Sequence, residues 1–246
     1  MIAVVHPSTI QGMIPAPASK SMMQRACALA LLHPGKTVIS NPGNSQDDLA
    51  AISIIQQLGA TVSSEHGQLI IQSTGIINPT GMVDCGESGL SFRMFSAIAA
   101  LGKVEVQING SGSLRNRPMH FLETVFPLLG VQCRLDHGHL PATVCGPMIP
   151  ADIHIDGSQS SQYLTGLLFA MASAAQKQVT ITVNNLVSKP YIDLSLAMLS
   201  HFGYDVHHED YHLFKINPVI KRTETIYVDI EGDWSNAAFL LVASVL

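Results

Sequence analysis

Apolar runs of helical length recur along the chain, and each begins directly after a short polar cluster. The polar clusters occupy residues 19–21, 89–91 and 160–162, and a fourth begins at Trp234. The run after the first cluster, residues 22–32, is apolar on nearly every side. This pattern is typical of a helix that is enclosed by other elements rather than laid on a surface. We therefore expect these helices to be buried.

The apolar runs belong to a repeat with a period of about seventy residues. Serines 21, 91, 161 and 235 mark the four copies and are separated by 70, 70 and 74 residues. A later amphipathic stretch in each complete copy ends at Gly59, Gly130 or Gly203, where a helix needs a C-terminal cap. β-branched runs lie between the helices, at residues 37–40, 104–108 and 179–183. Hairpin-like stretches such as residues 61–71 follow the glycines.

Each copy therefore predicts a strand, a helix, a strand, a helix and two further strands. Three complete βαβαββ units predict an α/β (α+β) fold in which mixed sheets surround the apolar helices. The last apolar run, residues 237–246, stops without a capping residue, which favours a chain that is part of a longer protein. The alternative is that this helix closes the domain. Asp233 is expected to be its N-cap.

Composition excludes several classes of protein. With 47% hydrophobic residues, 13% charged residues and a net charge of −5, the 246-residue chain predicts a globular protein without the basic field that holds nucleic acid. Its apolar stretches are shorter than the roughly 20 residues of a membrane span, and its start does not resemble a signal peptide. We expect a cytoplasmic monomer. The four cysteines form no C-x-x-C pair, so we expect reduced thiols, no metal and no cofactor.

The basic residues gather near the repeat motifs. Six of the 13 lysines and arginines do so: Lys20, Arg25, Arg93, Arg115, Arg117 and Lys189. A helix N-terminus is already positive, so cations beside it are unfavourable unless an anion binds there. Guanidinium groups hold phosphate or carboxylate through paired hydrogen bonds. The pattern predicts a small polyanionic ligand, although these cations could also pair with acidic side chains or extend to the surface.

Six segments carry a resemblance to a known family. They are residues 17–25 (PASKSMMQR), 86–93 (GESGLSFR), 114–118 (LRNRP), 156–168 (DGSQSSQYLTGLL), 188–196 (SKPYIDLSL) and 231–239 (EGDWSNAAF). In their order and spacing, these segments resemble motifs of the enolpyruvyl transferase family. Among the branches of that family, they resemble the one that acts on shikimate-3-phosphate. The resemblance implies a two-domain fold. Residues 1–19 would be a crossover strand of the second domain, 20–233 the substrate-binding domain and 234–246 the start of the second domain.

The resemblance also implies an activity. It would be transfer of the enolpyruvyl group of phosphoenolpyruvate to the 5-hydroxyl of shikimate-3-phosphate, with release of phosphate, in the shikimate pathway to chorismate and aromatic amino acids. The family's principal acid/base groups would lie in the second domain, so this chain alone is expected to be inactive. The alternatives are the branch that uses UDP-N-acetylglucosamine and a non-catalytic anion-binding domain.

Site residues follow from the resemblance position by position. Shikimate-3-phosphate is expected to contact Ser21, Arg25, Ser160, Ser161, Ser188 and Tyr191. Phosphoenolpyruvate is expected to contact Gly89, Arg117, Gln162 and the catalytic Lys20. Ser160 and Ser188 could instead cap helices, and Tyr191 could simply pack. The chain departs from the family at Glu87 and Leu90, where asparagine and threonine are usual, and at Gly112 and Ser113, where acidic residues are common.

Overall fold

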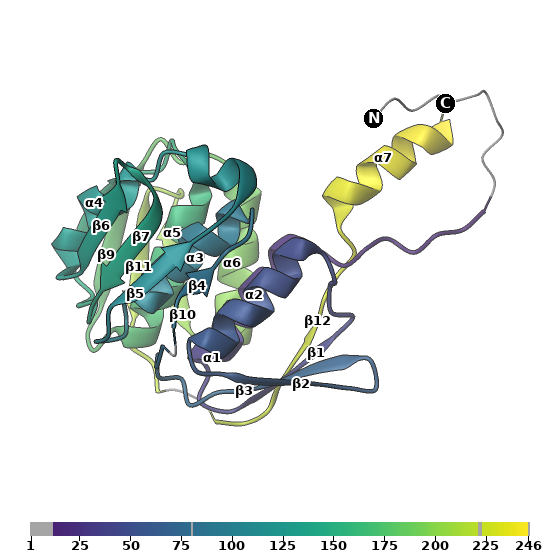
Figure 1. The fold of residues 1–246 in the computed structure, drawn as a ribbon, viewed down its shortest axis with the longest axis horizontal. Coiled ribbons are helices and arrows are strands. Elements are labelled where there is room, and N and C mark those ends of the chain that lie inside the picture. Colours follow the sequence, from purple (N-terminus) through teal and green to yellow (C-terminus); the bar gives the residue numbers. More distant parts are fainter. Residues whose placement is uncertain (1–11, 80, 221–222, 246) are drawn as a thin grey trace.

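The structure is a computed structural model that describes residues 12–79, 81–220 and 223–245. Its elements follow the predicted repeat (Figure 1). The first unit contains α1 (Lys20–Leu32), β1 (Lys36–Ser40), α2 (Gln46–Gln57), β2 (Thr61–Glu65) and β3 (Gln68–Gln72). The second contains β4 (Val83–Asp84), α3 (Gly89–Ala99), β5 (Val106–Asn109), η1 (Gly112–Asn116), α4 (His120–Val125), η2 (Phe126–Leu129), β6 (Gln132–Asp136) and β7 (His139–Cys145). The third contains β8 (Ile153–Asp156), α5 (Ser161–Ala174), β9 (Val179–Asn184), α6 (Lys189–His201), β10 (Asp205–Glu209) and β11 (Leu213–Asn217), and β12 (Ile226–Asp229) and α7 (Trp234–Val245) follow.

Three four-stranded sheets share one topology, with strand orders β12-β1-β3-β2, β4-β5-β7-β6 and β8-β9-β11-β10. The first strand in each of these orders is an edge strand that runs parallel to its neighbour. In the second and third sheets these parallel pairs are β4 with β5 and β8 with β9. The terminal hairpin is antiparallel in each case. In the first sheet this edge strand is β12, which pairs in parallel with β1. β12 comes after the third unit in the chain. The fourth strand of the first sheet is therefore supplied by the segment that follows the third unit.

The apolar helices α1, α3 and α5 lie at the centre and pack against one another, as the pattern predicts. Most of their residues are buried. Gly166 lets α5 approach α3 closely, because a Cβ at this position would lie 2.9 Å from the backbone oxygen of Arg93. Strands such as β5 and β7 alternate buried and more exposed residues, so one face of each sheet covers the helices.

Helix α7 differs from the other apolar helices. Trp234 and Phe239 are 75% and 79% exposed, and the helix extends away from the rest of the molecule (Figure 1). The prediction that every such helix is buried is therefore correct for α1, α3 and α5 and wrong for α7 in this structure. The predicted cap of α7 is confirmed, because Asp233 Oδ1 accepts the backbone N–H of Asn236 at 3.0 Å.

The glycines predicted to end the second helix of each unit have left-handed backbones. The φ angles of Gly59, Gly130 and Gly203 are +115°, +73° and +82°. In the second unit the α-helix α4 is short and continues as the 3-10 helix η2, because Pro127 has no N–H to donate within an α-helix. The predicted β-branched run at 104–108 begins its strand two residues later, at Val106.

Two further findings concern the described residues alone. No helix among them is both long and apolar enough to cross a membrane. No three histidine, cysteine or acidic side chains gather where they could hold a metal ion within that part of the chain. The four cysteines are free thiols, and burial raises the pKa of Cys27 and of Cys85 well above the usual range. These two thiols are therefore unreactive core groups.

Candidate active site

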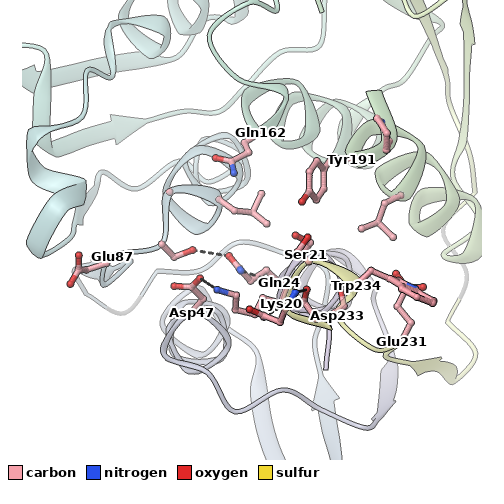
Figure 2. Close-up of a pocket in the computed structure, with 18 of the residues that line it drawn as sticks. Lys20, Ser21, Gln24, Asp47, Glu87, Gln162, Tyr191, Glu231, Asp233 and Trp234 are labelled. Atoms are coloured by element: carbon pink, nitrogen blue, oxygen red, sulfur yellow. Dashed lines mark hydrogen bonds and ion pairs between the residues drawn. The ribbon is translucent and has the colours of Figure 1, made fainter. Parts of the chain in front are cut away.

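The N-termini of α1, α3, α5 and α6 converge on two adjoining cavities. The larger cavity has a volume of about 600 Å³ and the smaller cavity about 250 Å³. Both are lined by Ser21, Leu90, Gln162 and Tyr191, so they meet at these residues. Figure 2 shows Lys20, Ser21 and Gln24 of α1 on one side of the larger cavity and Gln162 and Tyr191 on the other.

The structure groups the predicted site residues by cavity. The smaller cavity is lined by all six residues expected to contact shikimate-3-phosphate, namely Ser21, Arg25, Ser160, Ser161, Ser188 and Tyr191. The larger cavity is lined by all four residues expected to contact phosphoenolpyruvate, namely Lys20, Gly89, Arg117 and Gln162. Five segments that are far apart in sequence, around residues 20–25, 89, 117, 160–162 and 188–191, thus contribute to one site.

Serine side chains cap three of the converging helices. The hydroxyls of Ser19, Ser88 and Ser160 accept backbone N–H groups near the starts of α1, α3 and α5, at 3.4, 3.1 and 3.2 Å. The capping role considered for Ser160 is therefore correct. Ser188 precedes α6 with a left-handed φ of +57°, and its side chain makes no capping hydrogen bond. Ser188 is one of the residues that line the smaller cavity.

Arg25 is a buried cation at the wall of the smaller cavity. Only 1% of the residue is exposed, and its three nitrogens donate to Ser195 Oγ at 2.9 Å, Ser21 O at 2.8 Å and Tyr191 O at 3.2 Å. All three acceptors are neutral, and no carboxylate pairs with Arg25 among the described residues. Burial disfavours the charged form and lowers the pKa of Arg25 to about 10. A buried charge of this kind favours an anionic ligand.

Gln162 is held so that its amide nitrogen is available to a ligand. Arg93 Nη1 donates to Gln162 Oε1 at 2.7 Å, and a guanidinium can only donate, so the oxygen of the amide faces Arg93. The Arg93 guanidinium also lies over the ring of Tyr163, 5.3 Å from its centroid. The remaining donors of Gln162 suit a ligand that carries negative charge.

Gly89 permits the close approach of two guanidinium groups to the start of α3. A Cβ at this position would lie 2.7 Å from Arg117 Nη1 and 2.9 Å from Arg93 Nη1. Any other residue would displace one of these cations. Gly89 thus brings backbone and cations together at the wall of the larger cavity.

Two of the clustered cations also have partners within the protein. Lys20 Nζ lies 3.4 Å from Asp47 Oδ2, so the alternative of pairing with an acidic side chain is correct for this lysine. This ion pair is partly exposed and contributes about 1 kcal/mol or less, so an anion can compete for Lys20. Lys189 lies over the ring of Tyr211, 5.0 Å from its centroid.

Gln24 is a site residue that the sequence analysis missed. Its side chain is buried, and its Oε1 accepts the hydroxyls of Ser88 at 2.8 Å and Ser91 at 2.9 Å, which joins α1 to the start of α3. Its position four residues after Lys20 on a helix places it on the same face, and this was the available signal. Asp47 and Trp234 also line the larger cavity and were not predicted.

The repeated fold and these cavities define a class: α/β proteins with a polar, cation-lined site where helix N-termini converge, an arrangement that suits a small polyanion. A family model described as EPSP synthase (3-phosphoshikimate 1-carboxyvinyltransferase) matches residues 4–246. The chain belongs to the EPSP synthase family.

Curated relatives and solved structures agree with the family match. A 3-phosphoshikimate 1-carboxyvinyltransferase of Methanocorpusculum labreanum is 35% identical over all of this chain, which covers 58% of the relative. One of Aeropyrum pernix is 32% identical over 99% of this chain and is covered over 56% of its length. The structure of EPSP synthase from Acinetobacter baumannii superposes with a TM-score of 0.80 at 25% identity, covering 94% of this chain and 52% of that one. The chain therefore spans little more than half the length of these proteins.

Proposed function

We propose that this chain binds the substrates of an enolpyruvyl transfer reaction. In that reaction the enolpyruvyl group of phosphoenolpyruvate is transferred to the 5-hydroxyl of shikimate-3-phosphate. The observation that carries the proposal is Arg25, a buried cation without a carboxylate partner in the described part of the chain, at the wall of a polar cavity. The names of the relatives support the same reaction. The family match favours it over transfer to UDP-N-acetylglucosamine.

The smaller cavity suits shikimate-3-phosphate. The hydroxyls of Ser160, Ser161 and Ser188 can donate to and accept from ring hydroxyls and phosphate. The Arg25 guanidinium supplies the opposite charge to a carboxylate or phosphate group. The phenol of Tyr191 stands where the two cavities meet, beside both ligands in this arrangement.

The larger cavity suits phosphoenolpyruvate. Lys20 and Arg117 supply positive charge, Gln162 supplies an amide donor, and Gly89 allows close approach to the backbone. In the reaction the 5-hydroxyl gives up its proton and adds to the enol carbon of phosphoenolpyruvate that carries the phosphate, while the methylene carbon takes a proton. The tetrahedral intermediate then loses phosphate together with a proton of the new methyl group, which restores the carbon–carbon double bond. The catalytic role of Lys20 is to stabilise the charge that develops on the departing phosphate.

We further propose that residues 20–233 form the substrate-binding domain and that α7 begins a second one. The segments at the two borders of this domain run side by side. Ala18 and Gly232 form a bridge, Ser19 N donates to Glu231 O at 2.8 Å, and Asp233 N donates to Pro17 O at 2.7 Å. They support the proposed crossover, of which residues 1–11 lie outside the described part. The exposed apolar side chains of α7 suit contact with a further domain. Catalysis would then require that domain.

Calorimetric titration of the protein with shikimate-3-phosphate tests the proposal. We expect binding that is lost in an Arg25→Ala, Ser161→Ala variant and kept in an Arg134→Ala, Ser64→Ala variant, which changes the same residue types at exposed positions. UDP-N-acetylglucosamine is the competing ligand. Binding of that nucleotide sugar, with none of shikimate-3-phosphate, would contradict the proposed substrate.

A further inference from the structure

The carboxylate of Glu87 is engaged with the backbone of another loop. Glu87 Oε2 accepts the N–H of Ser113 at 3.0 Å, and Ser113 lies in η1. Figure 2 shows Glu87 at the edge of the larger cavity, away from Lys20 and Gln162. The two departures from the family pattern, an acid at 87 and the absence of acids at 112 and 113, therefore meet in space.

Helix η1 has no cap of its own. Its N-cap residue, Ser111, makes no side-chain hydrogen bond to the helix. The first N–H groups of any helix need acceptors, and a carboxylate is favoured there by the positive end of the helix. Glu87 supplies this acceptor from a segment 26 residues away. It caps η1 in place of a local side chain.

Gly112 leaves room for the Glu87 carboxylate. A Cβ at position 112 would overlap the carboxylate carbon of Glu87, and the backbone of Gly112 has a left-handed φ of +53°. Both facts favour glycine at this position. The carboxylate that occupies the space beside Gly112 thus reaches this loop from position 87.

The loop that Glu87 caps carries Arg117. Arg117 Nη2 donates to Ser113 Oγ at 3.3 Å, and the backbone N–H of Arg117 donates to Leu114 O at 3.2 Å. Leu114 is fully buried, which anchors the middle of the loop. A second link joins the two loops, because Ser111 N donates to Gly86 O at 2.7 Å. The contacts form a continuous series from Glu87 through Ser113 to Arg117.

We propose that Glu87 is a positioning residue that fixes the loop of residues 111–117 and thereby the guanidinium of Arg117 at the larger cavity. The identity of the affected ligand as phosphoenolpyruvate rests on the proposed function above. The capping contact itself does not, because it is a property of the unliganded protein. The smaller cavity is not involved, since Arg117 does not line it.

Amide hydrogen exchange followed by NMR tests the capping contact directly. We expect Glu87→Ala to speed exchange of the Ser113 amide about tenfold, the effect of removing a typical helix cap. Glu87→Gln keeps an acceptor at the same reach and should restore most of the protection. Glu65→Ala, at an exposed acid of the β2–β3 hairpin, is the matched control and should leave Ser113 unchanged. Equal Ser113 exchange in the wild type and Glu87→Ala would overturn the proposal.

Ligand titration tests the consequence for Arg117. With shikimate-3-phosphate present, Glu87→Ala should weaken phosphoenolpyruvate binding about tenfold, in keeping with the loss of one cap. Glu87→Gln should bind nearly as the wild type, and the affinity for shikimate-3-phosphate should not change in either variant. A wild type that binds neither ligand would count against the proposed function, while the exchange data would still decide the role of Glu87. Faster Ser113 exchange with unchanged phosphoenolpyruvate affinity would overturn the positioning of Arg117.

A double-mutant cycle separates the steric role of Gly112 from its backbone strain. Gly112→Ala should lower the unfolding free energy more in the wild type than in Glu87→Ala, because the new methyl group meets the carboxylate only when Glu87 is present. The cost of a left-handed alanine is common to both backgrounds. Additive effects would contradict the close contact between these two positions.

Discussion

Arg25 brings a charge into the protein interior and satisfies it with neutral oxygens. Three hydrogen bonds hold the guanidinium, and Ser195 in turn donates to Tyr191 O at 2.7 Å and lies 2.9 Å from Thr165 Oγ1. This set of hydrogen bonds therefore joins α1, α5 and α6. Because its orientation is fixed before any ligand arrives, little side-chain entropy is lost on binding.

Arg25→Lys tests whether the planar guanidinium, rather than the charge, matters at this position. A lysine has one nitrogen and cannot reach three acceptors from a fixed plane. We expect shikimate-3-phosphate affinity to fall about tenfold and the unfolding free energy to fall by about 1–3 kcal/mol, the cost of buried acceptors left without donors. Calorimetry and urea denaturation measure the two effects. Arg134→Lys, at an exposed ion pair with Glu105, should change neither.

Gly89→Ala tests the crowding at the start of α3. The added methyl group would meet Arg117 Nη1 and Arg93 Nη1 at distances too short for a stable contact, so at least one cation must move. We expect phosphoenolpyruvate affinity to fall about tenfold, comparable with the loss of one charge-assisted hydrogen bond, while shikimate-3-phosphate binds as before. Gly81→Ala is the control, because a Cβ there meets no atom within 4 Å. Equal affinities in the two variants would contradict the crowding.

At the scale of single elements, α2 begins with a reciprocal capping box. Asp48 Oδ2 accepts from Ser45 N at 3.0 Å and from Ser45 Oγ at 2.7 Å, and Ser45 Oγ accepts from Asp48 N at 3.3 Å. Asp48 is buried, and its Oδ1 has no hydrogen-bond partner in the described part of the chain. Burial raises the pKa of Asp48, and the hydrogen bonds from Ser45 oppose this only in part.

The raised pKa of Asp48 predicts a pH-dependent contribution to stability. The folded protein binds the Asp48 proton more tightly than the unfolded chain, so ionisation of this group lowers stability as pH rises from the ordinary aspartate range through the raised pKa. Asp48→Asn does not titrate and keeps an acceptor for Ser45. Its stability relative to the wild type should therefore increase between about pH 3.5 and pH 7. Urea denaturation at both pH values measures this.

At the scale of the whole molecule, β12 connects the two ends of the repeat array. It pairs in parallel with β1 at the edge of the first sheet, and Ile226, Val228 and Ile230 are buried in the core. The side chain of Asn41 donates to Ile230 O at 2.7 Å and secures the same junction. The chain then passes directly to Asp233 and α7, so closure of the first sheet also sets one border of the larger cavity.

Val228→Ala tests how strongly this closure stabilises the protein. Val228 is 3% exposed, and truncation should lower the unfolding free energy by about 2 kcal/mol. The hydrogen-exchange protection of β1 amides should fall together with that of β12 if the strands open as one unit. Tyr227→Ala changes a 68%-exposed side chain on the same strand and should have little effect. Loss of protection confined to β12 would indicate that the first sheet is stable without it.

Much of this architecture is predictable from the sequence because it depends on neighbouring residues. The apolar runs of α1, α3 and α5, the serine caps at 19, 88 and 160 and the glycines at 59, 130 and 203 act within one or two helical turns. The spacing of Ser21, Ser91 and Ser161 and of these three glycines predicts the repeat. The grouping of basic residues at those N-termini likewise predicts an anionic ligand before any contact is known.

Other features depend on segments that meet only after folding. The pairing of β12 with β1, the ion pair of Lys20 with Asp47 and the capping of η1 by Glu87 each join positions with no local signal between them. The exposure of α7 has the same origin, because burial depends on which elements are present to cover an apolar face and not on the apolar pattern itself. The sequence by itself determined the repeated elements, and its basic residues predicted an anionic ligand. The tertiary structure alone decided how the predicted side chains are held and which others, such as Gln24 and Asp47, join them at the cavities. The physical reason is that helices and strands are set by residues close together in the sequence, whereas these contacts join residues far apart in it.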